Sequence, residues 1–201
     1  ILKDVAARKS TIDLPLINTL MRFLADNIGN IVSNKKIADF LTSDGRKTTS
    51  VTIASYIEAL KNAFIIYDAK RYDIKGKQIL CSLEKFYLAD VGLRTFLLGS
   101  YTKDFGRILE NIVYMELLHR GYNVTVGKLR EKEIDFIAEK KGSKIYYQVA
   151  ASVLDSGTFQ REIAPLKRIP DNFPKYIISQ DKEMLGENGI TQKNIVQFLL
   201  E

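Results

Sequence analysis

The chain is poor in the residue types that most often carry covalent catalysis. Its 201 residues include one cysteine, one histidine and no tryptophan. A single cysteine excludes an internal disulfide and is typical of a reducing compartment. A nucleophilic cysteine would also need an activating base, and the one histidine, His119, lies at the end of a predicted helix. We therefore interpret Cys81 as a small buried apolar residue and His119 as a helix-terminal cation or a solvated side chain.

Long apolar runs, export signals and nucleotide-binding motifs are also missing. No run of eighteen apolar residues occurs, so the sequence predicts no transmembrane span. No signal peptide is found, and together with the lone cysteine this predicts a cytoplasmic protein. Nothing matches GxxxxGK[ST], so ATP binding is not expected of these residues. The chain begins at Ile1 rather than at a methionine, which predicts that it is part of a longer protein.

The composition fits one domain or two small ones. Apolar residues make up 46% of the sequence, which is enough for globular cores. The formal net charge is +6, and residues 1–102 carry 15 Lys and Arg against 10 Asp and Glu, whereas residues 103–201 carry 15 against 14. This modest excess indicates an anionic partner for the first half. A polar stretch at 100–104 predicts a linker between domains 1–99 and 100–201.

The first half predicts three amphipathic helices followed by a basic hairpin. N-capping residues and apolar periodicity place the helices at about 13–28, 33–41 and 48–62. Strand-like runs at 63–69 and 78–83 flank the hairpin Lys70–Lys77, which has Gly76 near its tip. This order is typical of a winged helix-turn-helix.

In a winged helix the third helix would read DNA and the hairpin would be the wing. The candidate DNA-binding residues are Thr49, Thr52, Ser55 and Tyr56 on the exposed helix face, and Lys70, Arg71, Lys75 and Lys77 on the wing. The same helix is expected to bury Val51, Ala54, Ile57 and Leu60. Glu58 opposes a phosphate contact, and the helix offers only Lys61 as a cation. The alternative is a wing that only packs on a neighbouring domain.

The second half is predicted to be a mixed sheet flanked by helices. Residues 85–90 read as a connecting strand, and a helix from about 106 to 120 ends before Gly121. In the hairpin that follows, alternation places Ile134, Phe136 and Ala138 on one face and Glu133, Asp135 and Ile137 on the other. Later elements are predicted at 155–168, 174–179 and 189–200. The resulting order α-β-β-β-α-β suits a mixed sheet with helices on its faces.

Three polar residues of this half outline a candidate Mg²⁺ site. Glu110 lies on the helix, Asp135 on a strand and Gln148 on the paired strand, and all three offer the hard oxygen ligands that Mg²⁺ prefers. The pattern resembles the PD-(D/E)xK, or restriction-endonuclease-like, superfamily, whose signature is a helix acid, a strand Asp and Glu-x-Lys on the next strand. Gln148-Val149-Ala150 stands where Glu-x-Lys is expected. Ala150 cannot supply the ammonium that orients water or stabilises the phosphate, so a standard nuclease is not supported.

Each of these residues also has an ordinary structural interpretation. Glu110 could form a cap or a salt bridge within its own helix, for instance with Arg107, and Asp135 could belong to the solvated face of an edge hairpin. Lys128, or Arg130 just beyond it, could supply a migrated cation in place of the motif lysine. Tyr146 and Tyr147 are interpreted as sheet packing rather than as platforms for base stacking.

A closer resemblance covers essentially the whole chain. It is similar to the large prokaryotic family of predicted AAA+-superfamily ATPases that carry a C-terminal domain of unknown function. The segments that carry this resemblance are ILKDV, SNKKIADFL, YIEALKNAFIIYDAKRYD, KFYLADVGLR, GRILENIVYMELLHRGYNVTVGKL and EIDFIAE. The resemblance implies a winged helix and a degenerate nuclease-like domain joined to an N-terminal P-loop ATPase. That ATPase half, which would bind ATP, is absent from these residues.

Three functions follow as hypotheses. The first is a non-catalytic module that recruits DNA or a partner to the fused ATPase, favoured by the missing motif lysine. The second is a Mg²⁺-dependent DNA nuclease in which Lys128 replaces that lysine. The third is a regulatory or toxin–antitoxin-like interaction surface that contacts no nucleic acid. No cofactor is expected in this chain apart from candidate Mg²⁺.

Overall fold

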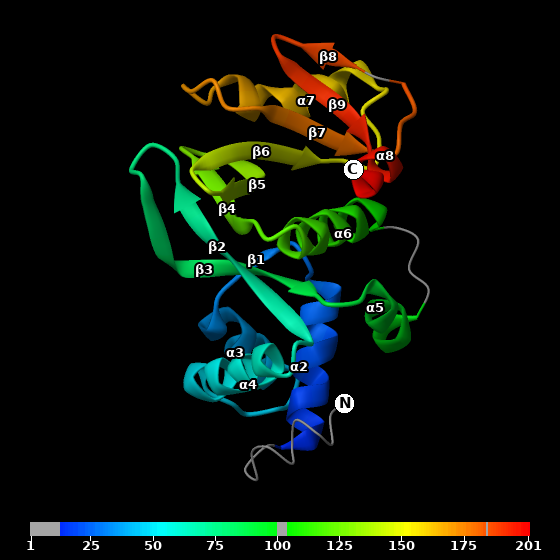
Figure 1. Cartoon of the computed structure of the whole chain (residues 1–201). Coiled ribbons are helices and arrows are strands. Elements are labelled where there is room, and N and C mark those ends of the chain that lie inside the picture. The colour runs from blue at the N-terminus through cyan, green and yellow to red at the C-terminus, as the bar shows by residue number, and fades with distance from the viewer. Residues whose placement is uncertain (1–12, 100–103, 184) are drawn as a thin grey trace. The chain divides into compact units, whose positions relative to one another are not determined.

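The chain forms a mixed α/β fold organised as two compact units. The computed structural model describes residues 13–99, 104–183 and 185–201 (Figure 1), which contain seven helices and nine strands. The first unit comprises residues 1–68 and 82–102, and the second comprises 69–81 and 103–201. The outer part of the basic hairpin therefore groups with the second unit, whereas the sequence prediction assigned the whole hairpin to the first domain.

The first three helices of the first unit begin at the predicted capping residues. The helices are α2 (Leu14–Asp26), α3 (Asn34–Ser43) and α4 (Ser50–Asn62). The Asp13 carboxylate accepts from the backbone N–H of Leu16 at 3.1 Å, and the hydroxyls of Ser33 and Thr49 accept in the same way at the starts of α3 and α4. These side chains satisfy backbone donors that a helix start leaves free.

The buried face of α4 matches the predicted one only in part. Ile57 and Leu60 are buried as predicted, but Val51 is 77% exposed, and Ile53 and Tyr56 are buried in addition. Tyr56 was predicted on the exposed DNA-reading face, but it is 5% exposed and its hydroxyl accepts a hydrogen bond from the backbone N–H of Asp13 at 2.7 Å. The prediction was wrong because an amphipathic pattern with apolar residues at 51, 53, 54, 56 and 57 allows two helix phases, and packing against α2 and α3 selected the other.

Two strand pairings and a short helix complete the first unit. The strand β1 (Ile31–Val32), which was not predicted, pairs antiparallel with β3 (Gln78–Leu88). Two separate strands were expected at 78–83 and 85–90, but β3 runs through both, with Leu83 at a positive φ of 72°. The partner of β3 in the hairpin is β2 (Ile66–Asp73), and α5 (Val91–Leu98) follows the N-cap Asp90.

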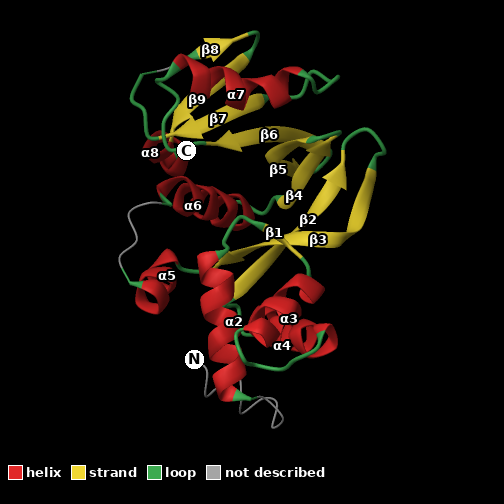
Figure 2. Cartoon of the chain, turned by 180° about the vertical axis from the view of Figure 1, so that it is seen from behind, coloured by secondary structure: helices red, strands yellow, loops and turns green. Residues whose placement is uncertain are grey.

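The second unit is built on a mixed sheet (Figure 2). From the outer part of β2 the strand order continues β4-β5-β6-β7-β9-β8, with antiparallel pairs in the β4–β5–β6 meander and parallel pairs at β6–β7–β9. Arg71 of β2 pairs in parallel with Val126 of β4. The strands are β4 (Asn123–Leu129), β5 (Lys132–Lys140), β6 (Ser143–Val149), β7 (Lys175–Ser179), β8 (Gly186–Glu187) and β9 (Ile190–Asn194).

Helices cover both faces of this sheet. The parallel step from β6 to β7 requires a crossover, which α7 (Ser156–Lys167) provides. Tyr146 and its neighbour Tyr147 point to opposite faces of β6: the first joins the buried cluster under α7, and the second packs edge-on against Phe198 at 5.7 Å. Phe198 belongs to α8 (Ile195–Leu200), which shares its face of the sheet with α6 (Phe105–His119). The two tyrosines are therefore sheet packing, as predicted.

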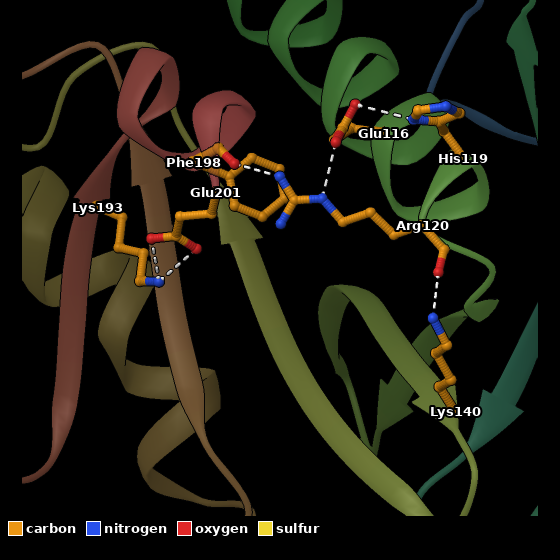
Figure 3. Close-up of polar contacts among 7 residues, drawn as sticks. All are labelled: Glu116, His119, Arg120, Lys140, Lys193, Phe198 and Glu201. Atoms are coloured by element: carbon orange, nitrogen blue, oxygen red, sulfur yellow. Dashed lines mark hydrogen bonds and ion pairs between the residues drawn. The ribbon is translucent and has the colours of Figure 1, made fainter.

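An arginine at the end of α6 fixes α8 (Figure 3). The Arg120 guanidinium donates to Glu116 at 2.7 Å and to the backbone carbonyl of Phe198, and it stacks 4.4 Å from the Phe198 ring centroid. Its own carbonyl accepts from Lys140 Nζ at 2.6 Å. His119 is the last residue of α6 and is 86% exposed, with its Nδ1 3.9 Å from Glu116 Oε2, which agrees with its interpretation as a solvated side chain at a helix end. The end of β5 and both helices are thus joined through one residue.

Candidate functional site

A bulge in β5 controls how the candidate nuclease-like residues are presented. Gly127 pairs with Ile134 and Thr125 with Ile137, so β5 has one residue more than β4 across this interval. A Cβ on Gly127 would lie 2.9 Å from Ile134 Cβ and 3.0 Å from Ile137 Cδ1, so both isoleucines lie on the same face as this glycine. The strict alternation predicted for 133–138 was therefore wrong, because a bulge shifts the period of a strand by one residue.

Asp135 lies beside Gln148, because the register of β5 and β6 places the two residues opposite each other. The Asp135 backbone N–H donates to Gln148 Oε1 at 3.2 Å, and the Val149 backbone N–H donates to Asp135 Oδ2 at 2.8 Å. Regular pairing of β5 with β6 begins only at Phe136 opposite Tyr147. Side-chain oxygens thus replace backbone acceptors where the two strands stop pairing, and each of these side chains already serves a structural hydrogen bond.

The sequence analysis missed a third member of this group, Glu162 on α7. Gln148 Nε2 donates to Glu162 Oε2 at 3.2 Å, and Arg161 approaches the other oxygen, Oε1, at 3.1 Å. Helical periodicity alone could not have singled out Glu162, because only the packing of α7 across β6 places it beside Gln148. The Gln148 amide therefore bonds to the Asp135 backbone N–H through its oxygen and to the Glu162 carboxylate through its nitrogen, so the group is not a set of unpaired carboxylates.

The other three positions of the predicted site are Ala150, Lys128 and Glu110. Ala150, at the position of the motif lysine, is 9% exposed and belongs to the apolar cluster that contains Val153 and Ile163. Lys128 lies on β4 opposite Glu133, two residues before Asp135 on β5. Glu110 is half-buried on α6. Among residues 13–99, 104–183 and 185–201 no cluster of three or more His, Cys, Asp or Glu side chains could hold a metal. Because the predicted set contains only two carboxylates, that finding leaves it untested.

The predicted DNA-binding residues fall in both units. In the first unit, Thr49 is exposed but serves as the N-cap of α4, and its hydroxyl lies 3.1 Å from that of Thr52. Thr52 and Ser55 are half-buried, and Tyr56 is buried. The helix face therefore presents fewer free donors than the sequence predicted.

In the second unit the basic hairpin keeps its charges accessible. Lys70, Lys75 and Lys77 are exposed, whereas Arg71 is half-buried and its Nε is a buried donor without a partner. Asp73 Oδ1 accepts from the backbone N–H groups of Lys75 and Gly76 at 3.0 and 3.1 Å, which closes the turn. The one acid of the turn thus binds backbone donors and leaves the lysine side chains available.

Burial and hydrogen bonding shift the ionisation of the sheet tyrosines. Burial raises the pKa of Tyr146 well above its usual value, and its hydroxyl donates to Asp171 Oδ2 at 2.6 Å, which adds to the rise in pKa. Burial likewise raises the pKa of Tyr147. Both hydroxyls therefore stay protonated in the physiological range and act as structural groups.

Comparison with other proteins places the chain in a family without assigning an activity. It is 40% identical over its whole length to an uncharacterized protein of Haemophilus influenzae, of which it covers 50%. It is 34% identical over 67% of its length to the uncharacterized protein MJ1544 of Methanocaldococcus jannaschii, of which it covers 31%. The chain thus spans half or less of these relatives. No solved structure matches it significantly.

The described part of the chain also contains no helix long and apolar enough to span a bilayer. Residues 1–104, which include α2, α3, α4 and the whole hairpin, match one family description. The chain belongs to the family described as Domain of unknown function (DUF8612).

Proposed function

We propose that this chain is a non-catalytic, nucleic-acid-binding module of a longer prokaryotic ATPase. The observation that carries the proposal is the contrast between a nuclease-like position without a lysine and a basic hairpin with accessible ones. Ala150 is buried in an apolar cluster, and Asp135 already accepts from the Val149 backbone N–H. A phosphoryl-transfer site needs cations and free carboxylates at the reacting phosphate. This arrangement favours binding without cleavage.

The arrangement of each unit supports the fold assignment within this proposal. In the first unit, three capped helices and the antiparallel β1–β3 pair follow the order of a winged helix. In the second unit, α6, the β4–β5–β6 meander, the α7 crossover and β7 follow the order expected of a nuclease-like domain. Relatives at least twice as long as the chain leave room for an ATPase half, which would supply ATP binding.

The exposed hairpin is the part of the module that we assign to nucleic acid. Phosphate contacts from Lys side chains give affinity that is independent of base sequence and falls with salt. Lys70 and Lys77 are exposed at the two sides of the hairpin turn. The hydroxyl-bearing face of α4, with Thr49 occupied as a cap, adds little charge to this contact.

A second function, a Mg²⁺-dependent nuclease, is favoured by one observation. Lys128 on β4 is paired with Glu133 on β5, and Glu133 is two residues before Asp135 on the same strand. In this alternative Glu110, Asp135 and Gln148 would hold Mg²⁺. Cleavage of duplex DNA that requires Mg²⁺ and disappears in both Asp135→Ala and Lys128→Gln would establish it in place of the binding module.

The proposal is tested by measuring affinity for a fluorescent DNA duplex between 50 and 300 mM salt, with and without Mg²⁺. Substituting Lys70→Gln together with Lys77→Gln should weaken binding and reduce the slope of log affinity against log salt by about 2. The matched control is Lys141→Gln with Lys182→Gln, two exposed lysines of the same unit away from the hairpin. Unchanged binding by the hairpin variant, or no binding at the lowest salt, would refute the nucleic-acid contact.

A further inference from the structure

The second unit contains a pocket that is lined by cations and apolar side chains only. Its volume is about 560 Å³, within the range of small-ligand pockets. The residues that line it are Ile74, Lys75, Leu129, Arg130, Arg168 and Pro170. The positive residues come from three different places: the turn of the basic hairpin, the β4–β5 turn and the C-terminal end of α7. The fold therefore brings together three positive residues, Lys75, Arg130 and Arg168, that are far apart in the sequence.

The three positive side chains are available for a ligand. No ion pair joins Lys75, Arg130 or Arg168 to any residue that the structure describes, and no acidic side chain lines the pocket. The nearest acid along the hairpin, Asp73, binds backbone N–H groups instead. Three like charges converging without a counter-ion repel one another, so an anion in the pocket would stabilise the arrangement.

The walls of the pocket are apolar. Ile74 packs against the core cluster under α7, and Leu129 is a buried member of that cluster. Pro170 completes the lining two residues after Arg168. A simple inorganic anion would leave these surfaces uncovered. A ligand with a charged phosphate and an adjoining apolar or aromatic portion would use both parts.

Arg130 occupies a backbone conformation that suits glycine better. Its φ is 56°, and it begins the two-residue turn between β4 and β5, which pair as Leu129 opposite Lys132. Such turns favour Asn or Gly where φ is positive, and a bulky side chain there is strained. Backbone strain of this kind is enriched at ligand clamps, where the side chain is needed. Lys141 has the same conformation in the turn between β5 and β6, so the turn geometry alone does not assign Arg130 to binding.

Arg168 by itself has a simpler explanation. It is the C-cap of α7, where a positive side chain is stabilised by the helix dipole. That explanation does not extend to Arg130 or Lys75, which lie on turns between strands. The convergence of all three, rather than any single residue, is what carries the argument.

We propose that this pocket binds the terminal phosphate of a nucleic-acid strand, with the adjoining sugar and base against the apolar wall. A phosphomonoester carries a charge of about −1.5 to −2, which matches three cations better than the single charge of an internal phosphodiester. This inference rests on the proposed nucleic-acid contact, and it specifies that the terminal phosphate is the part of the strand that is recognised. A free mononucleotide offers the same phosphomonoester and is the other source of this chemistry.

The test compares a 12-residue single strand with a 5′-phosphate, the same strand with a 5′-hydroxyl, and adenosine 5′-monophosphate, each titrated into the whole chain. The 5′-phosphorylated strand is expected to bind about tenfold more tightly than the hydroxyl strand. Arg130→Gly and Arg168→Gln should each reduce that ratio towards one. Because glycine relieves the positive φ, Arg130→Gly should not lower the melting temperature, so its loss of binding would not reflect unfolding.

The matched control is Lys141→Gly. Lys141 also has a positive φ, 50°, and also begins a two-residue turn, between β5 and β6. The two turns lie at opposite ends of β5, which is nine residues long. Lys141→Gly removes the same charge and the same strain, but it should leave the preference for the 5′-phosphate unchanged.

The outcomes separate the pocket from the proposed function. Equal affinity for both strands would overturn the pocket while leaving nucleic-acid binding intact, as would a preference that survives both arginine substitutions. Binding of adenosine 5′-monophosphate, lost in Arg130→Gly, without binding of either strand would support the phosphate pocket, name a free nucleotide as its ligand and refute the nucleic-acid module. No binding of any of the three probes would overturn both.

Discussion

The nuclease-like position and the basic pocket lie in the same unit but use their polar side chains in opposite ways. Asp135 and Gln148 exchange hydrogen bonds with each other's strands, and Gln148 also donates to Glu162. Lys75, Arg130 and Arg168 form no ion pair with a described residue. Polar groups that satisfy one another contribute to stability, whereas groups left without partners are available to a ligand. Within this unit, side chains that hydrogen-bond to one another and cations without a counter-ion are therefore found in separate places.

Asp181 is the centre of a hydrogen-bond network within the second unit. Its loss should have the largest effect on the free energy of unfolding. The Asp181 carboxylate accepts from Ser152 Oγ at 2.8 Å, from the Val153 backbone N–H at 2.7 Å and from Ser179 Oγ at 2.9 Å. Asp181→Ala would leave the Val153 N–H and the Ser179 hydroxyl buried without this acceptor, because both residues are 0% exposed, whereas Ser152 is exposed and can bond to water. We expect the free energy of unfolding to fall by about 3 kcal/mol, measured by urea denaturation.

The control for this substitution is Glu183→Ala, which removes an exposed carboxylate two residues away. Surface substitutions of this kind usually change stability by about 0.5 kcal/mol or less. If Asp181→Ala lowers the free energy of unfolding no more than the control does, hydrogen-bonded carboxylates contribute little to the stability of this unit. The comparison between hydrogen-bonded groups and unpaired cations would then fail.

A smaller effect is expected at the nuclease-like position itself. Asp135→Ala removes the acceptor of the Val149 N–H, and since Asp135 is only half-buried, we expect a loss of about 1 to 2 kcal/mol in the free energy of unfolding. DNA affinity should stay unchanged, with or without Mg²⁺, because Asp135 serves the strands and not the ligand. Weaker DNA binding that depends on Mg²⁺ would instead assign Asp135 to a metal site, and the contrast between the two regions would disappear.

The smallest effect concerns α7, the helix that carries both Glu162 and Arg168. Its N-cap is Asp155, whose pKa is lowered mainly by the hydrogen bond from the Thr158 backbone N–H, at 2.7 Å. Because the folded-state pKa is lowered, the stabilisation is present above the unfolded pKa of about 3.9 and is lost as the pH falls through the folded pKa. Asp155→Asn keeps a good cap but cannot titrate.

The measurement is thermal unfolding of the chain and of Asp155→Asn between pH 2.5 and 7. The two melting temperatures should be close at pH 7, and the variant should lose less stability below about pH 4. Identical acid dependence would show that the cap does not contribute to acid unfolding of α7. Phosphate binding, measured at neutral pH, should not differ between the two.

Local signals in the sequence predicted most elements of the fold. Asp13, Ser33 and Thr49 each cap the expected helix, because a capping side chain acts on backbone groups two or three residues away. Gly121 follows α6 at a φ of 77°, as its predicted role in ending the helix requires. The strands β1 and β8 were missed because each has only two residues and too few side chains to show a pattern.

The candidate site was predictable only in part. Asp135 and Gln148 are close, as expected, because neighbouring strands of a hairpin bring their facing residues together. Tyr56 was misplaced, because its hydroxyl reaches the start of α2, 43 residues away in sequence. The sequence did not indicate that Glu162 lies beside Gln148, or that the residues of the basic pocket lie together. In both cases the neighbouring residues come from different elements.

The sequence by itself determined where most helices begin and end, the absence of a motif lysine at Ala150, and the basic character of the hairpin. Only the tertiary structure decided which face of α4 is buried, that a bulge next to the Gly127–Ile134 pair shifts the period of β5, and that Lys75, Arg130 and Arg168 line one pocket. The reason is physical: caps, turns and composition act over a few residues of chain, whereas burial and charge convergence depend on packing between elements that are distant in sequence.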